Sequence, residues 1–286
     1  MTTPHEPMIT RRSATTAALW SVPVIAATTQ VPHAAATEST CEDSQIQFGW
    51  STATMVEQNR FTDPALQNQP FTNTVAFLPE SSLPGADDLP PVMLTIDHVF
   101  HGNAYGVSSG GNEYATIDGS ATPNGVALAP GIYDISQRLE PWVDTPPTAN
   151  DWSDWTFTFG APVSGLSFTI ADVDRALASS GDQQFIDGVA IHSADAPLTF
   201  SFGTDADFVG DGSIADPFRV NPSATTGNLD YDDPRTHINV HASGSITTFT
   251  IRYFNLAPNV VSGWGISAQG VYLASFSFTG TVPCTP

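Results

Sequence analysis

Short segments in which apolar and polar residues alternate recur along most of the chain. They are rich in β-branched and aromatic residues, and clusters of Gly, Pro, Asn and Asp separate them. This pattern predicts β-strands, because successive side chains of a strand point to opposite faces of the sheet. The predicted strands are Gln45–Trp50, Thr74–Leu78, Val92–Phe100, Ile132–Gln137, Trp155–Phe159, Gly165–Asp172, Phe185–His192, Leu198–Phe202, His237–His241, Ile246–Phe254 and Gly270–Phe278.

No stretch of ten or more residues has the apolar spacing of a helix. The sequence therefore predicts an all-β fold, in which two antiparallel sheets pack face to face and bury their apolar sides between them. The polar stretches between strands predict long loops. Sandwiches of 200–250 residues commonly form one domain, so we expect a single domain over residues 37–286.

Residues 1–36 have the pattern of an export signal. A polar start leads to Arg11 and Arg12, an apolar run follows over Ala14–Ala27, and Ala34–Ala36 is a small-residue cleavage site. The paired arginines resemble a twin-arginine signal. The apolar run contains Pro23 and is shorter than the roughly 20 residues of a spanning helix. We expect cleavage after Ala36 and a secreted protein without a membrane span.

The composition excludes several partners. The chain has 29 acidic and 8 basic residues, all eight of them Arg, and its net charge is −21. Nucleic acid and anionic membranes would be repelled by such a charge. No chemistry that needs a lysine amine is open to the chain. Hydrophobic residues make up 41% and charged residues 13%, which is typical of a folded protein with a core.

The two cysteines, Cys41 and Cys284, lie near opposite ends of the predicted domain. Disulfides persist in exported proteins, so we expect these residues to form a bridge. Such a bridge would join the first and last segments of a single unit. The alternative is two free thiols.

Part of the chain resembles a known kind of module. Spaced Phe, Pro, Val, Ile and Asp residues run through Trp155–Asp174 and Phe185–Ile191, and a further aromatic and β-branched segment follows at Ile246–Tyr253. Together they resemble the jelly-roll β-sandwich modules of secreted and surface proteins of bacteria, actinobacteria especially, and the resemblance covers residues 125–278 well and 41–124 loosely. The residues that carry the resemblance are Phe157, Phe159, Pro162, Val163, Phe168, Ile170, Asp172, Asp174, Asp187 and Val189. The resemblance implies a jelly-roll-like fold and a role in adhesion or carbohydrate contact, although fold analogy alone does not determine function.

Three aspartates predict a calcium site. Asp172 and Asp174 continue the apolar face of the segment Leu166–Asp174, and Asp187 begins the apolar face of the next predicted strand. If these strands pair as a hairpin, the carboxylates meet at one edge of the core. Buried anions are costly without a counter-ion, and calcium prefers oxygen ligands. We therefore expect a structural calcium ion. In the alternative, Arg175 pairs with one Asp and the others cap turns.

A Trp-rich loop is the candidate ligand site. Trp142 and Trp152, with Asp151 and Asp154 beside the latter, have the chemistry that binds sugars, since aromatic rings cover C–H faces and carboxylates accept hydrogen bonds from hydroxyls. Trp155 is expected to begin a core strand. The alternative is that all these Trp residues cover the end of the sandwich.

Other motifs are weaker. Asp205–Gly212 has only the first spacings of a helical-loop calcium site. His237 and His241 would lie about 13 Å apart on a strand, too far for one metal ion, so we expect surface or interior hydrogen-bonding histidines. Gly106–Gly110 matches a nucleophile motif but lacks a following helix.

No pair of carboxylates stands out as glycosidase machinery. We therefore expect a secreted, non-catalytic binding or adhesion module that contacts carbohydrate and holds calcium. An extracellular glycan hydrolase and a structural envelope protein without a small ligand are the alternatives.

Overall fold

A computed structural model describes residues 44–57, 69–79, 90–105, 133–139, 147–177, 183–224, 229–257 and 269–282. Residues 41–286 form one compact unit, separate from residues 1–40. The described residues form antiparallel β-sheets with two short 3₁₀ helices, η1 (Trp50–Thr52) and η5 (Pro234–Thr236). Among them, no helix is long and apolar enough to cross a membrane.

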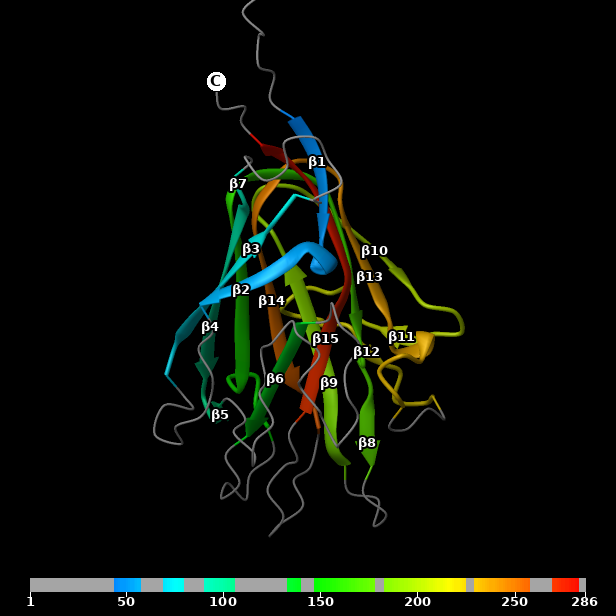
Figure 1. Cartoon of the computed structure of the whole chain (residues 1–286). Helices are drawn as coiled ribbons and strands as arrows, with labels where there is room; N and C mark the ends of the chain where they lie inside the picture. Colours follow the sequence, from blue (N-terminus) through cyan, green and yellow to red (C-terminus); the bar gives the residue numbers. More distant parts are fainter. Residues whose placement is uncertain are drawn as a thin grey trace, which may run out of the picture. The chain divides into compact units, whose positions relative to one another are not determined.

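The first layer has seven strands in the order β2-β3-β4-β7-β14-β9-β8 (Figure 1). Its strands are β2 (Ala53–Glu57), β3 (Phe71–Phe77), β4 (Val92–His101), β7 (Trp152–Ala171), β14 (Ile246–Asn255), β9 (Gln183–His192) and β8 (Arg175–Leu177). In β4 the side chains at alternate positions from Leu94 to Phe100 are buried. This burial has the period of two that the sequence pattern predicted.

The second layer is built around the other half of β7. There β7 pairs with β13 (Ile238–Ala242) and β15 (Gln269–Val282). Further strands extend this layer on both sides of them. These are β10 (Leu198–Phe202) beside β13, β1 (Ser44–Gly49) and β6 (Tyr133–Leu139) beside β15, and β5 (Ala104–Tyr105) beside β6.

Strand β7 belongs to both layers. Its first half pairs with β4 as far as Phe159 and with β14 as far as Val163. Its second half pairs with β15 from Ser164 and with β13 from Ser167. Between them the strand turns, and Gly165 has a φ of +60°, which glycine adopts without steric cost. We predicted two strands here. The structure shows one bent strand that runs without a break from Trp152 to Ala171.

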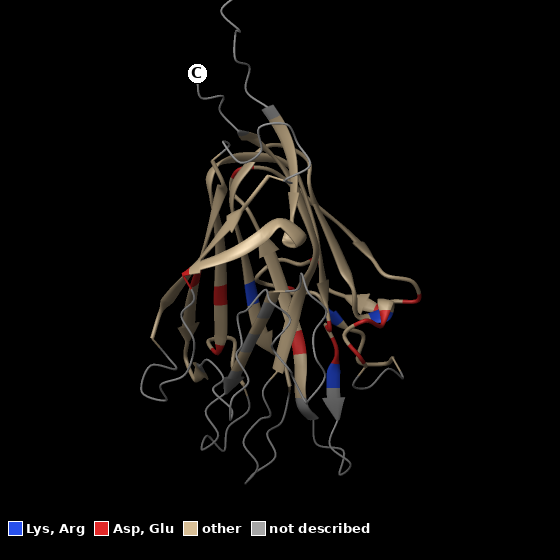
Figure 2. Ribbon diagram, in the orientation of Figure 1, with Lys and Arg blue, Asp and Glu red and all other residues tan. Residues whose placement is uncertain are grey.

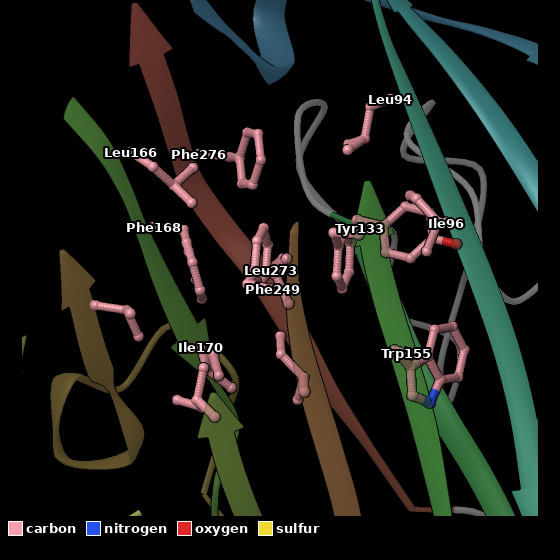
Figure 3. Packing of buried hydrophobic residues seen from close by; sticks show 14 of the residues in the cluster. Leu94, Ile96, Tyr133, Trp155, Leu166, Phe168, Ile170, Phe249, Leu273 and Phe276 are labelled. Carbon is pink, nitrogen blue, oxygen red and sulfur yellow. The ribbon is translucent and has the colours of Figure 1, made fainter. Parts of the chain in front are cut away.

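The core lies between the layers. Trp155 and Phe157 from the first half of β7 are fully buried, as are Phe168 and Ile170 from its second half. In Figure 3, Leu166 and Phe168 of the second half lie with Phe249 of β14 and Phe276 of β15, and Trp155 of the first half lies on the side of Tyr133. The Phe157 and Phe249 rings stack with centroids 4.6 Å apart. The two-layered, antiparallel all-β architecture predicted from the sequence is confirmed.

A long excursion, residues 203–237, separates β10 from β13, although these two strands pair directly. It contains a second small sheet of β11 (Phe208–Val209) and β12 (Arg219–Val220). Aspartates organise its turns, as Asp233 does when it accepts a hydrogen bond from the N–H of Arg235 at the start of η5. Charged residues are sparse on the strands and mark this excursion and the lower part of the sandwich (Figure 2).

The predicted hairpin between Leu166–Asp174 and Phe185–Ile191 is wrong. The second half of β7 pairs with β13 and β15, whereas β9 pairs with β14 and β8. The strand ends at Ala171, and Asp172 adopts a left-handed φ of +68° that interrupts the alternation. Five short or exposed strands were not predicted from the sequence: β2, β5, β8, β11 and β12.

Candidate functional site

Long connections meet the sheets at one end of the sandwich, which we call the loop end. His101 at the end of β4 lies opposite Trp152 at the start of β7, and Phe254 of β14 lies opposite Trp152 on the other side. Residues 106–132, 140–146 and 258–268 continue from β5, β6 and β14 and lie outside the described residues. Loops at the end of a sandwich commonly carry ligand contacts, so the loop end is the candidate site.

Asp174 and Asp187 lie side by side in the interior of the loop end, with only 2% and 1% of their surfaces exposed. The N–H of Asp174 donates to Oδ2 of Asp187 over 3.0 Å. The N–H of Asp187 donates to the carbonyl oxygen of Asp174, also over 3.0 Å. The adjacent pairing of Arg175 with Ile186 sets this geometry. The structure thus brings two of the three predicted ligands together, by a strand pairing different from the predicted one.

Neutral donors surround the Asp187 carboxyl. The Tyr253 hydroxyl donates to its Oδ1 over 2.5 Å, and Nε2 of Gln269 donates to the same oxygen over 3.3 Å. Burial raises the pKa of Asp187 well above its ordinary value, and the charge of Asp174 adds to this, whereas the hydrogen bond from Tyr253 opposes it. Burial also raises the pKa of Tyr253. The surroundings therefore favour a neutral carboxyl at Asp187.

Asp174 is less strongly perturbed. Burial raises its pKa from 3.8 to about 7, and a hydrogen bond from the N–H of Leu229 partly opposes the shift. That bond, to Oδ2, is 2.7 Å long. At neutral pH the pair is poised between sharing protons and carrying adjacent negative charges.

Asp172, the third predicted ligand, is half-buried, and its charge contributes to the raised pKa of Asp187. Within the described ranges, no group of three or more His, Cys, Asp or Glu residues is arranged to hold a metal ion. Donors already occupy both oxygens of Asp187. A cation would therefore depend mainly on Asp174, and the calcium site stays a prediction. Arg175, the alternative partner for these acids, donates to the carbonyl oxygens of Pro222 and Ala224.

Trp152 lies on the outward face of the first layer at the loop end. The His101 ring stacks on it with centroids 3.4 Å apart, and the guanidinium carbon of Arg252 lies 3.5 Å from its ring centroid. His101 and Arg252 come from β4 and β14, on opposite sides of β7, so the ring lies between them. The sugar contact predicted for Trp152 needs a ring face open to solvent. Trp152 is instead half-buried between two neighbours.

Both acids beside Trp152 have structural partners. Asp154 accepts two hydrogen bonds of 2.8 Å from Arg252 in a forked ion pair. Asp151 is buried and accepts hydrogen bonds from the N–H groups of Asn103 and Thr148. It therefore joins the end of β4 to the turn before β7. Trp142 lies outside the described residues, as do Cys41, Cys284, Gly106–Gly110 and the export signal.

Two polar chains run through the interior near this end. Nε1 of Trp155 donates to Oγ of Ser153 over 3.0 Å, and Ser153 donates to Oε1 of Gln137 over 2.8 Å. Nδ2 of Asn73 donates to the Tyr133 hydroxyl over 3.2 Å, and that hydroxyl lies 3.0 Å from Nε2 of His98. Tyr253, Gln137 and Gln269 were not predicted as site residues from the sequence. The available signal was a polar residue at a core position, as in the run of Tyr133, Ile135 and Gln137.

His98 is an interior hydrogen-bonding residue. Its ring lies between Phe71 and Trp155, with centroids 4.0 and 3.8 Å away. Burial lowers its pKa well below the ordinary value, so it is neutral at physiological pH. His237 likewise has a hydrogen-bond partner, the carbonyl oxygen of Tyr231 at 3.0 Å, and His241 is exposed.

No family model, curated protein or solved structure matches the chain. The site is therefore described by its own geometry. The site has two parts. Buried acids stabilise the loop end from inside, and a half-exposed row of aromatic and charged side chains lies on the outside.

Proposed function

We propose that this chain is an exported, non-catalytic binding or adhesion module that contacts carbohydrate with its loop end. The observation that carries the proposal is the row formed by His101, Trp152, Arg252 and Asp154 on the outward face of β4, β7 and β14. Planar polar groups beside an aromatic edge suit sugar hydroxyls and C–H groups. Trp142, outside the described residues, is the second ring in the proposal.

The buried acids support a non-catalytic role. A glycosidase needs two carboxyls that flank the scissile bond of its substrate. Asp174 and Asp187 are almost completely buried, and their hydrogen bonds go to backbone groups, Tyr253 and Gln269. They are therefore placed to hold β8, β9 and β14 together.

One observation favours a hydrolase as the alternative. The pKa of Asp174 is raised to about 7 beside a second carboxyl, as general acids require. In that case the mature protein would release reducing ends from polysaccharide, and Asp174→Asn would abolish the release.

Calcium is a separate part of the proposal. Two adjacent buried carboxyls with raised pKa values would be stabilised as anions by a cation. The ion would be structural, since the pair lies in the interior.

A glycan array probed with the mature protein, residues 37–286, tests the proposal. We expect binding to at least one neutral or cationic glycan. Trp142→Ala and Asp154→Ala should each weaken retention at least tenfold, and the exposed residue Gln47 on β1 provides the matched control Gln47→Ala. Wild-type protein that is folded and binds no glycan on a broad array would refute carbohydrate recognition. It would then favour a structural envelope protein.

A further inference from the structure

Four buried side-chain atoms in the described part of the chain have no hydrogen-bond partner. They are Nδ1 of His98, Nε2 of Gln137, Nδ2 of Asn255 and Oε1 of Gln269. A buried polar atom without a partner has lost its hydrogen bonds to water without replacement, so such atoms are rare and call for a partner. Three of the four belong to amide side chains at the loop end.

Gln137 and Gln269 lie directly opposite each other on β6 and β15. Directly opposed residues of an antiparallel pair share one face, with Cβ atoms about 5 Å apart. Both side chains face the interior, with 0% and 3% of their surfaces exposed. The two residues, each with one unpaired amide atom, therefore lie beside each other on one interior face of the sandwich.

The hydrogen bonds of both amides determine their orientation. Nε2 of Gln269 donates to Oδ1 of Asp187 and to the carbonyl oxygen of Phe254, and a reversed amide would place oxygen against two acceptors. Oε1 of Gln137 accepts from the Ser153 hydroxyl, and a reversed amide would take this acceptor away from the hydroxyl hydrogen. An unpaired donor on Gln137 therefore accompanies an unpaired acceptor on Gln269.

This combination fits a neutral hydroxyl group. A hydroxyl oxygen accepts from Nε2 of Gln137 while its hydrogen is donated to Oε1 of Gln269. A cation would be repelled by the amide hydrogens of Gln137, and an anion by Oε1 of Gln269 and the nearby Asp187. Asn255, which follows Phe254 on β14, has a further buried N–H without a partner.

We propose that Gln137 and Gln269 form a buried site for one neutral hydroxyl group, supplied by a sugar or by a water molecule. In the sugar form the site deepens the proposed function, on which it then rests. In the water form it is independent of that function.

A crystal structure of the mature protein, alone and soaked with neutral monosaccharides (glucose, galactose and mannose), tests the proposal directly. We expect an oxygen within about 3 Å of both Nε2 of Gln137 and Oε1 of Gln269. A water in both crystals identifies the water form, and a sugar hydroxyl in the soaked crystal identifies the sugar form. Well-ordered side chains with no density between them would overturn the proposal.

Calorimetric titration of the same monosaccharides separates the sources in solution. In the sugar form, Gln137→Met should weaken the affinity at least tenfold, and Gln47→Met on exposed β1 should leave it unchanged. In the water form neither wild type nor variant binds the sugars, and the crystal still shows the oxygen. A negative glycan array would refute carbohydrate binding while leaving the water form intact.

Discussion

Asp174 and Asp187 bind each other through two backbone N–H groups, each making a hydrogen bond of 3.0 Å to an oxygen of the other residue. The two acids are therefore held together by the main chain. Their proximity does not depend on an ion, and the neutral form of the pair is the one that burial favours.

Stability should fall as the pH rises through the titration of this pair. The folded-state pKa of Asp174 is raised from 3.8 to about 7, so the folded protein holds a proton that the unfolded chain has released. Between about pH 4 and 7 this shift alone would reduce the free energy of unfolding by up to about 4 kcal/mol. Thermal melts from pH 4 to 8 measure the slope.

Asp174→Asn provides the matched test of that slope. An Asn side chain can still accept from the N–H of Leu229 but does not titrate, so the fall in stability should become shallower. The exposed acid Asp230 gives the control Asp230→Asn, which should keep the wild-type slope. A slope that is equally steep in Asp174→Asn would show that other groups cause it.

Tyr253→Phe should destabilise the protein. The substitution removes the hydroxyl that donates to Oδ1 of Asp187 and leaves a buried acceptor with one donor fewer. We expect a loss of about 1–3 kcal/mol in the free energy of unfolding, measured by chemical denaturation. Tyr231→Phe, at a half-buried tyrosine of the 203–237 excursion, is the control. Equal stability of the two variants would contradict the structural role of this bond.

Calcium should act most strongly where the pair would otherwise be charged. If the predicted ion binds at Asp172, Asp174 and Asp187, added calcium should raise the melting temperature at pH 8 and EDTA should lower it. At pH 5 protons already neutralise the buried pair, so the effect should be small. If neither calcium nor EDTA changes the melting temperature at either pH, the predicted calcium site is refuted.

The pairing of β1 with β15 bears on the predicted disulfide. Ser44 lies opposite Val282. Cys41 comes shortly before Ser44 in the sequence and Cys284 shortly after Val282, and both cysteines lie outside the described residues. A bridge there would close a loop of most of the domain and stabilise it by about 4–5 kcal/mol in the chain-entropy picture. We expect no titratable thiol in denatured, unreduced protein. Two thiols per chain would disprove the bridge.

The strands with a clear period of two could be predicted from the sequence, because burial on one face imposes that period. Leu198–Phe202 was predicted with its observed bounds. The pairing partner of each strand could not be predicted, because alternation shows which face of a strand is buried but not which strand lies beside it. The predicted hairpin was wrong for two reasons. Strand β7 turns from one layer into the other, and Asp172 has a left-handed backbone conformation.

For the site, the sequence indicated that Asp174 and Asp187 would meet. It did not reveal Tyr253 and Gln269, which come from strands distant in the sequence and complete the surroundings of Asp187. The open ring expected at Trp152 was misjudged for a similar reason. Only the lateral order of β4, β7 and β14 shows that His101 and Arg252 cover it.

The β1–β15 ladder has a mechanical consequence. Because Ser44 and Val282 face each other in an antiparallel pair, tension that pulls them apart loads the hydrogen bonds one pair at a time. Such a ladder unzips under a small force, whereas a sheared ladder resists as a whole. If the protein were attached at its ends and exposed to flow, a covalent bond beside this pair, such as the predicted disulfide, would have to carry the tension.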